Sequence, residues 1–137
     1  MDRWKFQKAS QMKLDEARTL LQAGHYAGAY YLLGYAVECA LKACLTIQVK
    51  QYDFPDKKPA NEAHTHDLDK LKKIAGLDYS FSEELNTNRV FENNWAVVKD
   101  WNESSRYDTG IDKLQAKDFF SACLDEEGIL EWIKKRW

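Results

Sequence analysis

The chain has 137 residues, which is the size of one domain, and we interpret residues 1–137 as a single unit. Hydrophobic residues make up 45% of it and aromatic residues 13%, which suffices for a core and argues against disorder. The formal net charge is only −2 and the basic residues are spread out, so no broad nucleic-acid-binding surface is indicated. Two prolines and six glycines are few, which favours long helices over a β fold with many turns.

Apolar or small residues recur at spacings of three and four near the N-terminus, with polar residues between them. This pattern predicts an amphipathic helix over about 2–22, ended by Gly24. The residues on its inner face are Phe6, Ser10, Leu14, Ala17 and Leu21. Because the first residues are charged and form no apolar signal region, we expect a cytoplasmic protein.

The next segment, 27–49, is apolar on nearly every side and carries only two charges, Glu38 and Lys42. A helix of this kind is either buried or membrane-spanning. Two charges near its middle and the polar remainder of the chain favour burial, so no membrane association is expected. One amphipathic helix cannot cover such a rod, so several helices or a second subunit must surround it.

Residues 50–65 contain the run 53–59 with two prolines and predict a polar loop. A short helix follows, with Thr65 as the expected N-cap and Gly76 as its end. Its inner face carries Leu68, Leu71, Ile74 and Ala75. Ser80 or Ser82 is expected to cap another short turn.

The last third of the chain predicts two longer helices separated by a loop at 107–110. The first covers about 88–105, and the second covers about 115–135. Phe91, Trp95, Val98 and Trp101 form one stripe of the first, which we interpret as core or dimer interface. No segment alternates with period two as a strand would. The expected fold is therefore all-α, an up-and-down antiparallel bundle of four to five helices.

The three cysteines, Cys39, Cys44 and Cys123, lie within apolar helical stretches. Cys39 and Cys44 are five residues apart, roughly 140° around a helix, so they cannot clip a metal together. We interpret all three as buried free thiols in a reducing compartment. Neither a metal nor a cofactor is expected.

Three stretches of the sequence, taken in order and spacing, resemble the HEPN family, the higher-eukaryote and prokaryote nucleotide-binding domain. The first runs through 17–29 and 34–43, the second is 64–68 (HTHDL), and the third is 103–107 (ESSRY). The resemblance implies an antiparallel helical bundle that commonly forms a homodimer. In bacteria such domains are often encoded beside a minimal nucleotidyltransferase as a toxin–antitoxin pair, and others bind nucleotides or cleave RNA.

Ribonucleases of this family resemble one another in an arginine and a following histidine with four to six residues between them. An imidazole near neutral pH and a cation for the phosphorane charge suit that chemistry. Arg106 occupies the expected arginine position, but positions 111–113 are Ile-Asp-Lys. Arg18 and His25 match the spacing formally, yet they lie at the end of the first helix, where packing and turn residues are expected. We therefore predict no strong ribonuclease activity.

Other residues are candidates for binding a ligand. His64 and His66 precede a helix N-terminus, where they either hydrogen-bond the loop or contact an anion. Glu38 and Lys42 are one turn apart in the buried helix, where each charge needs a partner or belongs to a polar pocket. We expect Arg106 to be the partner of Glu38.

Arg106, Tyr107 and Asp108 form the last candidate group, because arginine can fork onto a phosphate and tyrosine can stack on a base. The alternative is that Arg106 caps helix carbonyls and Tyr107 packs. The leading hypothesis is a non-catalytic nucleotide-binding or protein-interaction module, the HEPN half of a pair with a nucleotidyltransferase. One rival is an RNA-cleaving toxin that uses Arg106 with His64 or His66, and another is a purely structural helical dimer.

Overall fold

The structure of the chain is a computed structural model that describes residues 2–51 and 64–137, with side chains over 2–49 and 64–137. The loop predicted over 50–65 lies outside the described residues except at its two ends, and α2 extends to Gln51. No strand occurs among the described residues, so the predicted all-α bundle is confirmed. Its elements are α1 (Arg3–Gln22), α2 (Tyr26–Gln51), α4 (Leu68–Ile74), α5 (Asp78–Thr87), α6 (Arg89–Val98), the 3₁₀ helix η1 (Glu103–Tyr107), α7 (Lys113–Leu124) and α8 (Ile129–Lys134).

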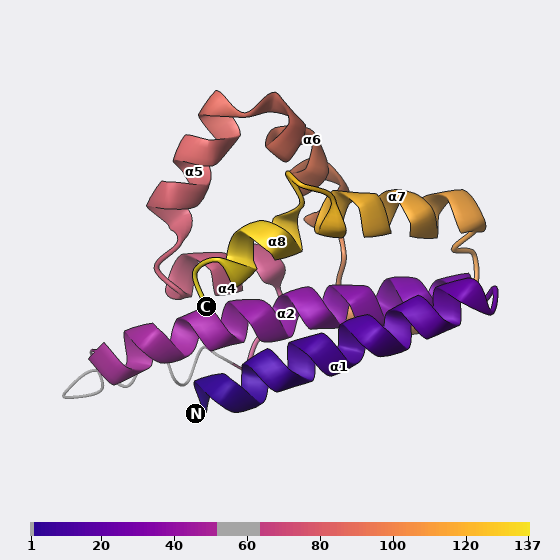
Figure 1. Cartoon of the computed structure of the whole chain (residues 1–137), viewed down its shortest axis with the longest axis horizontal. Coiled ribbons are helices and arrows are strands. Elements are labelled where there is room, and N and C mark those ends of the chain that lie inside the picture. The colour runs from indigo at the N-terminus through magenta and orange to yellow at the C-terminus, as the bar shows by residue number, and fades with distance from the viewer. Residues whose placement is uncertain (1, 52–63) are drawn as a thin grey trace.

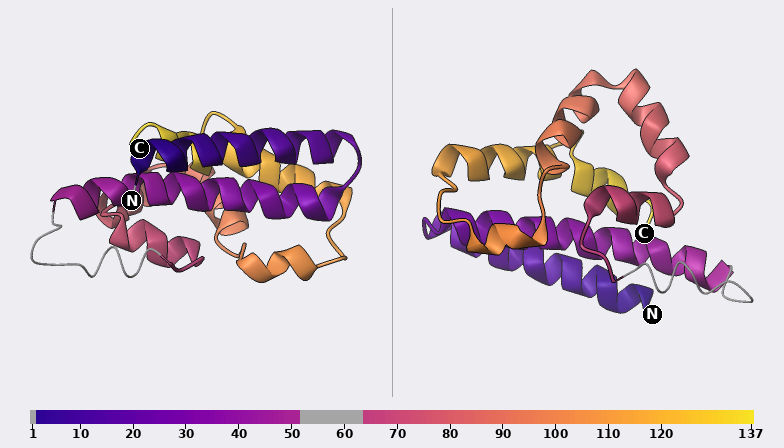
Figure 2. Two further views of the ribbon diagram at one scale, coloured as in Figure 1. Left: turned by 90° about the horizontal axis from the view of Figure 1, so that it is seen from below. Right: turned by 180° about the vertical axis from the view of Figure 1, so that it is seen from behind.

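Helices α1 and α2 form a long antiparallel hairpin (Figures 1 and 2). Asp2 caps α1, where its carboxylate accepts a hydrogen bond from the Trp4 backbone N–H at 3.0 Å. Gly24 ends the helix with a φ of +83°, and the following N–H of His25 donates to the Leu20 carbonyl at 2.8 Å. The predicted first helix and its glycine stop are therefore confirmed.

Helix α2 is the centre of the molecule. It contacts α1 along its length, and α4, η1, α7 and α8 contact its other sides, while α5 and α6 lie farther out (Figures 1 and 2). The segment Tyr26–Val49 is long and apolar enough to cross a membrane by length and composition. However, 67% of the 18-residue stretch that meets this hydropathy test is buried within the protein. A buried Ser10 hydroxyl donates to the Ala36 carbonyl at 2.7 Å and ties α1 to α2. The predicted burial of this segment is confirmed.

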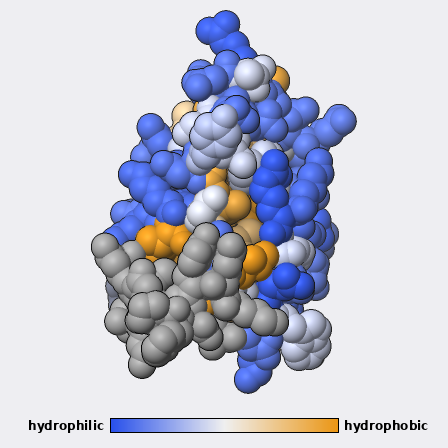
Figure 3. All heavy atoms as spheres, turned by 90° about the vertical axis from the view of Figure 1, so that its left-hand side faces the viewer, coloured by the Kyte–Doolittle hydropathy of each residue, from blue (hydrophilic) through white to orange (hydrophobic). Residues whose placement is uncertain are grey.

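In the view of Figure 3, most of the residues drawn in colour are hydrophilic, and the hydrophobic ones show mainly near the middle of the face. The apolar side chains of α2 are mostly turned inward, among them Leu33, Val37, Leu41 and Leu45, which are each at most 1% exposed. Burial of this kind is the main favourable contribution to folding.

The aromatic stripe of α6 is part of the core of a single subunit. Phe91, Trp95 and Val98 are 1%, 8% and 0% exposed. The Phe81 ring of α5 packs edge-on against the Phe91 and Trp95 rings, with centroids 5.0 and 4.8 Å apart. Phe81 also packs against Trp132 of α8 at 5.1 Å. The stripe therefore joins α5, α6 and α8.

Two predicted helices are each divided in the structure. The helix expected over 88–105 ends at Val98, because Trp101 leaves the helix to pack on Gly34 and Asn102 then caps η1. The helix expected over 115–135 is interrupted between α7 and α8. Gly128 lies there against the Cys123 carbonyl, where a Cβ would overlap the backbone.

Two predicted caps were wrong. Asp67, and not Thr65, caps α4, because its carboxylate accepts from the Lys70 N–H at 3.0 Å while the Thr65 hydroxyl accepts from the Asp67 N–H at 3.2 Å. Ser80 and Ser82 lie inside α5, whose N-terminus has no side-chain cap. The predicted end at Gly76 is confirmed, with a φ of +75°. All three cysteines are free and buried, as predicted.

Candidate functional site

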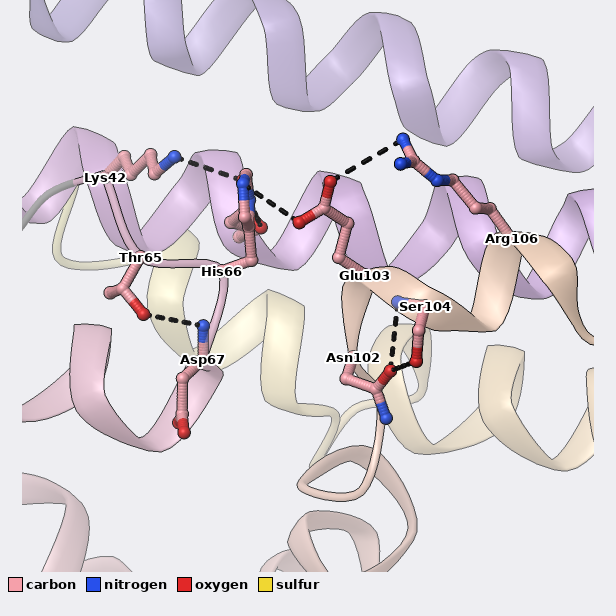
Figure 4. Close-up of polar contacts among 9 residues, drawn as sticks. Lys42, Thr65, His66, Asp67, Asn102, Glu103, Ser104 and Arg106 are labelled. Carbon is pink, nitrogen blue, oxygen red and sulfur yellow. Dashed lines mark hydrogen bonds and ion pairs between the residues drawn. The ribbon is translucent and has the colours of Figure 1, made fainter.

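Five charged or titratable side chains form one continuous row across a face of α2, drawn in Figure 4. Helix α2 contributes the two that the sequence places one turn apart. The segment before α4 contributes a histidine, and η1 contributes a carboxylate and a guanidinium. We call this set the polar row; it runs Lys42, Glu38, His66, Glu103 and Arg106.

Each member of the polar row contacts the next. Lys42 Nζ lies 3.1 Å from Glu38 Oε2, and the other oxygen, Oε1, lies 2.9 Å from His66 Nδ1. His66 Nε2 lies 3.1 Å from Glu103 Oε2. Arg106 Nη1 completes the row 3.6 Å from Glu103 Oε1 (Figure 4). The imidazole therefore bridges two carboxylates that belong to different elements.

The protonation of His66 decides the charge pattern of the row. Both ring nitrogens can donate to the flanking carboxylates only when the imidazole carries two protons. Positive and negative charges then alternate along the whole row. Glu38 is 0% exposed, and such a carboxylate is costly to bury unless its oxygens are satisfied. Lys42 and His66 provide one partner for each of its oxygens.

Local capping positions the two segments that meet on α2. Asp67 caps α4 and its N–H donates to the Thr65 hydroxyl, which fixes the backbone on both sides of His66. On the other segment, Asn102 caps η1 by accepting from the backbone N–H of Ser104 at 3.0 Å, and the Ser104 hydroxyl also contacts the Asn102 side chain (Figure 4). These turns set the directions of His66 and Glu103.

An open groove of about 520 Å³ lies beside the middle of the polar row. It runs between the segment before α4 and the segment that joins α6 to η1. The residues that line it are His66, Asp67, Lys99, Asp100, Trp101, Asn102, Glu103 and Ser104. The half-exposed His66 and Glu103 of the row are therefore accessible from solvent, whereas Glu38 is not.

The predicted pairing of Arg106 with Glu38 is wrong. Arg106 pairs with Glu103, three residues before it on η1, while Glu38 is satisfied by Lys42 and His66. The reason is the short 3₁₀ turn, which places Glu103 next to the guanidinium. The Arg106 guanidinium also lies 4.8 Å from the Tyr107 ring centroid. The Tyr107 hydroxyl and then Glu103 raise the Arg106 pKa, so it stays a cation.

The other predicted site residues lie outside the polar row. Tyr107 is 72% exposed beside Arg106, so it is not packed in the core. Asp108 is exposed, and its carboxylate accepts from the Gly110 N–H at 2.8 Å. His64 is exposed in the turn before α4, and no contact between described residues joins it to the row. Of the two histidines predicted there, the structure brings only His66 to the site.

The formal arginine–histidine match in the first hairpin has a structural explanation. Arg18 Nη1 lies 3.9 Å from Asp15 Oδ1 on the exposed side of α1. His25 closes the turn to α2 through its backbone. Among the described residues, no group of three His, Cys, Asp or Glu side chains is placed to hold a metal ion.

Sequence reasoning missed the roles of Glu103 and Lys72. Glu103 begins the stretch ESSRY, and its position three residues before Arg106 was the available signal. Lys72 is 5% exposed, with Nζ 3.0 Å from Asp69 and 3.3 Å from Asp78. Its Nζ also lies 4.7 Å from the Phe81 ring centroid. It ties α4 to α5, and no local pattern distinguishes it from the exposed lysines.

Comparisons with family models, curated proteins and solved structures found no match to this chain. The structure itself shows an all-α bundle built around a buried, mostly apolar helix that carries one carboxylate.

Proposed function

We propose that this protein is a HEPN-like, non-catalytic module that binds a nucleotide beside η1. The observation that carries the proposal is the polar row itself. Its members come from all three stretches that resemble the family: Glu38 and Lys42 from the first, His66 from the second, and Glu103 and Arg106 from the third. Residues that are distant in sequence and share one row support a common role.

The geometry of His66 favours binding over catalysis. A general base needs a ring nitrogen with a free lone pair within reach of the proton it removes. Both nitrogens of His66 face carboxylates, at 2.9 and 3.1 Å. The imidazole is thereby held as a bridge between α2 and η1, so we assign it the positioning of η1.

The binding groups are at the exposed end of the row. Arg106 has a side chain that is 45% exposed, and its guanidinium has more donors than its ion pair with Glu103 uses. The exposed Tyr107 ring adjoins it. A guanidinium suits a phosphate, and a tyrosine ring suits the face of a base. This pair therefore suits a nucleotide or the end of an RNA strand.

The test is binding of ATP, GTP and a short single-stranded RNA, measured by calorimetry with thermal shift as a screen. We expect Arg106→Ala to weaken binding by about tenfold, which corresponds to about 1.4 kcal/mol. Arg18→Ala is the matched control, because Arg18 is also half-exposed and pairs with an acidic residue three positions before it. Equal affinity of both variants for every probe would reject this site.

The ribonuclease alternative is favoured by one observation: His66 and Arg106 contact the same carboxylate, Glu103, on its two oxygens. An imidazole and a guanidinium are thus close together in one subunit. Incubation with labelled RNA in the presence of EDTA tests it. Cleavage that disappears in both His66→Ala and Arg106→Ala would replace the binding proposal with the enzymatic one.

We also propose that the protein acts as a homodimer with a nucleotidyltransferase-type partner, as the family resemblance implies. The reading frame beside the gene, sedimentation of the purified chain and co-purification of the two expressed proteins test this. A purely structural dimer is the remaining alternative. It predicts that neither nucleotides nor RNA shift the melting temperature.

A further inference from the structure

A second groove lies between the end of α6 and the start of α7, away from Glu38 and His66. Its volume is about 390 Å³. Acidic and apolar residues line it, without a lysine or an arginine: Tyr30, Ala96, Val97, Asp100, Asp112, Leu114, Gln115 and Asp118. We call it the α6–α7 groove. A neighbouring depression of about 430 Å³ shares Tyr30, Asp100 and Gln115 with it and adds Asp108.

No basic side chain among the described residues neutralises the carboxylates of the α6–α7 groove, although Asp112 caps α7. Asp100, Asp112 and Asp118 form no ion pair with any described residue. Lysines stand on the same elements, at 99, 113 and 117, but none of them lines the groove. A surface of this kind attracts a cationic partner and repels phosphates. Its charge therefore suits a different occupant from a nucleotide, although Asp100 also lines the groove beside the polar row and Tyr107 also lines the neighbouring depression.

The groove also has apolar side chains that are exposed to solvent in the described part of the chain. Leu114 is 69% exposed and Val97 is 41% exposed. Tyr30 lies beneath them and is 8% exposed, and its hydroxyl has no hydrogen bond to a described residue although it lines both depressions. Burial, and next the charge of Asp100, raises the Tyr30 pKa, so the hydroxyl remains a donor. Apolar residues rimmed by charge are typical of a protein-binding surface.

We propose that the α6–α7 groove binds a basic amphipathic segment of a partner protein. Aliphatic side chains of that segment contact Leu114 and Val97, and its lysines or arginines pair with Asp100 and Asp118. A backbone carbonyl or a side-chain acceptor of the segment receives the Tyr30 hydroxyl. Nucleic acid and anionic membranes are excluded as occupants by the sign of the charge.

The probe is a synthetic helical peptide of about four turns, with leucines along one face and lysines on both flanks. Its binding to the whole chain is followed by fluorescence anisotropy. We expect the affinity to fall on the order of fivefold when NaCl is raised from about 0.05 M to about 0.3 M, because exposed charges are screened. A peptide with glutamate in place of lysine should not bind.

The groove variant is the double substitution Asp100→Asn and Asp118→Asn, which spares Asp112 because that side chain caps α7. We expect it to weaken peptide binding at least tenfold. The matched control, Asp125→Asn with Glu126→Gln, removes two exposed carboxylates at the other end of α7 and should leave binding unchanged. Leu114→Ser should weaken it as well, without loss of stability, because Leu114 is 69% exposed.

Equal binding by the groove and control variants would overturn the proposal. A change of sedimentation from dimer to monomer in the groove variant would overturn it too, because the occupant would then be a second copy of this chain. Nucleotide affinity is measured on the single variants Asp118→Asn and Leu114→Ser, because neither residue lines the groove beside the polar row. It should be unchanged in both, so the failure of this inference and the failure of the proposed nucleotide site are distinguishable.

Discussion

At the scale of single residues, we expect the carboxylate of Glu38 to be the charged group on which stability depends most. It is 0% exposed in a mostly apolar helix, and its two oxygens contact Lys42 and His66. A buried ion pair adds little net stability by itself, but removal of one partner leaves the other charge unpaired. Glu38 therefore makes the stability of the fold depend on the candidate site.

We predict that Glu38→Ala lowers the free energy of unfolding by about 3 kcal/mol, through the lost partners and the cavity left behind. Glu103→Gln is the control, because Glu103 is 35% exposed and should cost about 0.5 kcal/mol. Urea unfolding followed by circular dichroism measures both. Equal losses would show that burial does not distinguish the two carboxylates.

The cysteines give a prediction about pH. Burial raises the pKa of both the Cys39 and the Cys44 thiols to about 11, and it raises the pKa of Cys123 as well. Only the thiolate reacts with iodoacetamide, and its fraction falls about tenfold for each pH unit below the pKa. At pH 8 we expect mass spectrometry to find no alkylated thiol in the native protein and three alkylated thiols in the protein unfolded in urea. A modified thiol in the folded protein at pH 8 would contradict the burial.

At the scale of elements, the contact between η1 and α2 depends on one glycine. Gly34 lies in α2 against the Trp101 ring, and a Cβ there would overlap the indole. The ring is 2% exposed and cannot move aside into solvent without losing its burial. Gly34 therefore allows Trp101 to dock, and Trp101 immediately precedes the turn that carries Glu103.

We predict that Gly34→Ala destabilises the protein by about 2 kcal/mol, as overpacking of a core does. It should also weaken nucleotide binding, because Glu103 and Arg106 shift with η1. Gly28→Ala is the matched control on the same helix, since its Cβ would lie 3.1 Å from the flexible Leu20 side chain. The higher helix propensity of alanine should offset the cost of that close contact. Thermal unfolding compares the two, and a loss in Gly28→Ala as large as in Gly34→Ala would reject the docking role.

The sequence predicts α1 from its three-and-four periodicity and α2 from its long apolar run. It fails at Val98, because Trp101 continues the three-and-four spacing of Phe91, Trp95 and Val98 although the helix has ended. The spacing indicates which residues are buried and not whether the backbone between them is helical. Asn102, a strong N-cap residue before Glu103, was the local signal for the break.

At the scale of the whole molecule, the polar row could be predicted only in part. Charges in an apolar helix must find partners, so a partner for Glu38 was expected. The identity of that partner depends on how the segment 28 positions further along returns to α2, and local patterns do not contain that information. His66 was a candidate for its place before a helix, and the fold alone joins it to Glu38.

The packing of the other helices around α2 determines which of its side chains are buried. The segment Tyr26–Val49 is long enough to cross a membrane, and in a membrane two positions at similar depth would have similar surroundings. In the folded protein the surroundings of two such positions differ, because Leu45 is 0% exposed and Ile47 is 37% exposed. We predict that Leu45→Asp lowers the free energy of unfolding by about 4 kcal/mol or more, because it buries an unpaired carboxylate. Ile47→Asp should cost less than about 1 kcal/mol, because its carboxylate reaches water. Urea unfolding without detergent measures both, and equal losses would indicate that the other helices do not surround α2 as the structure has it.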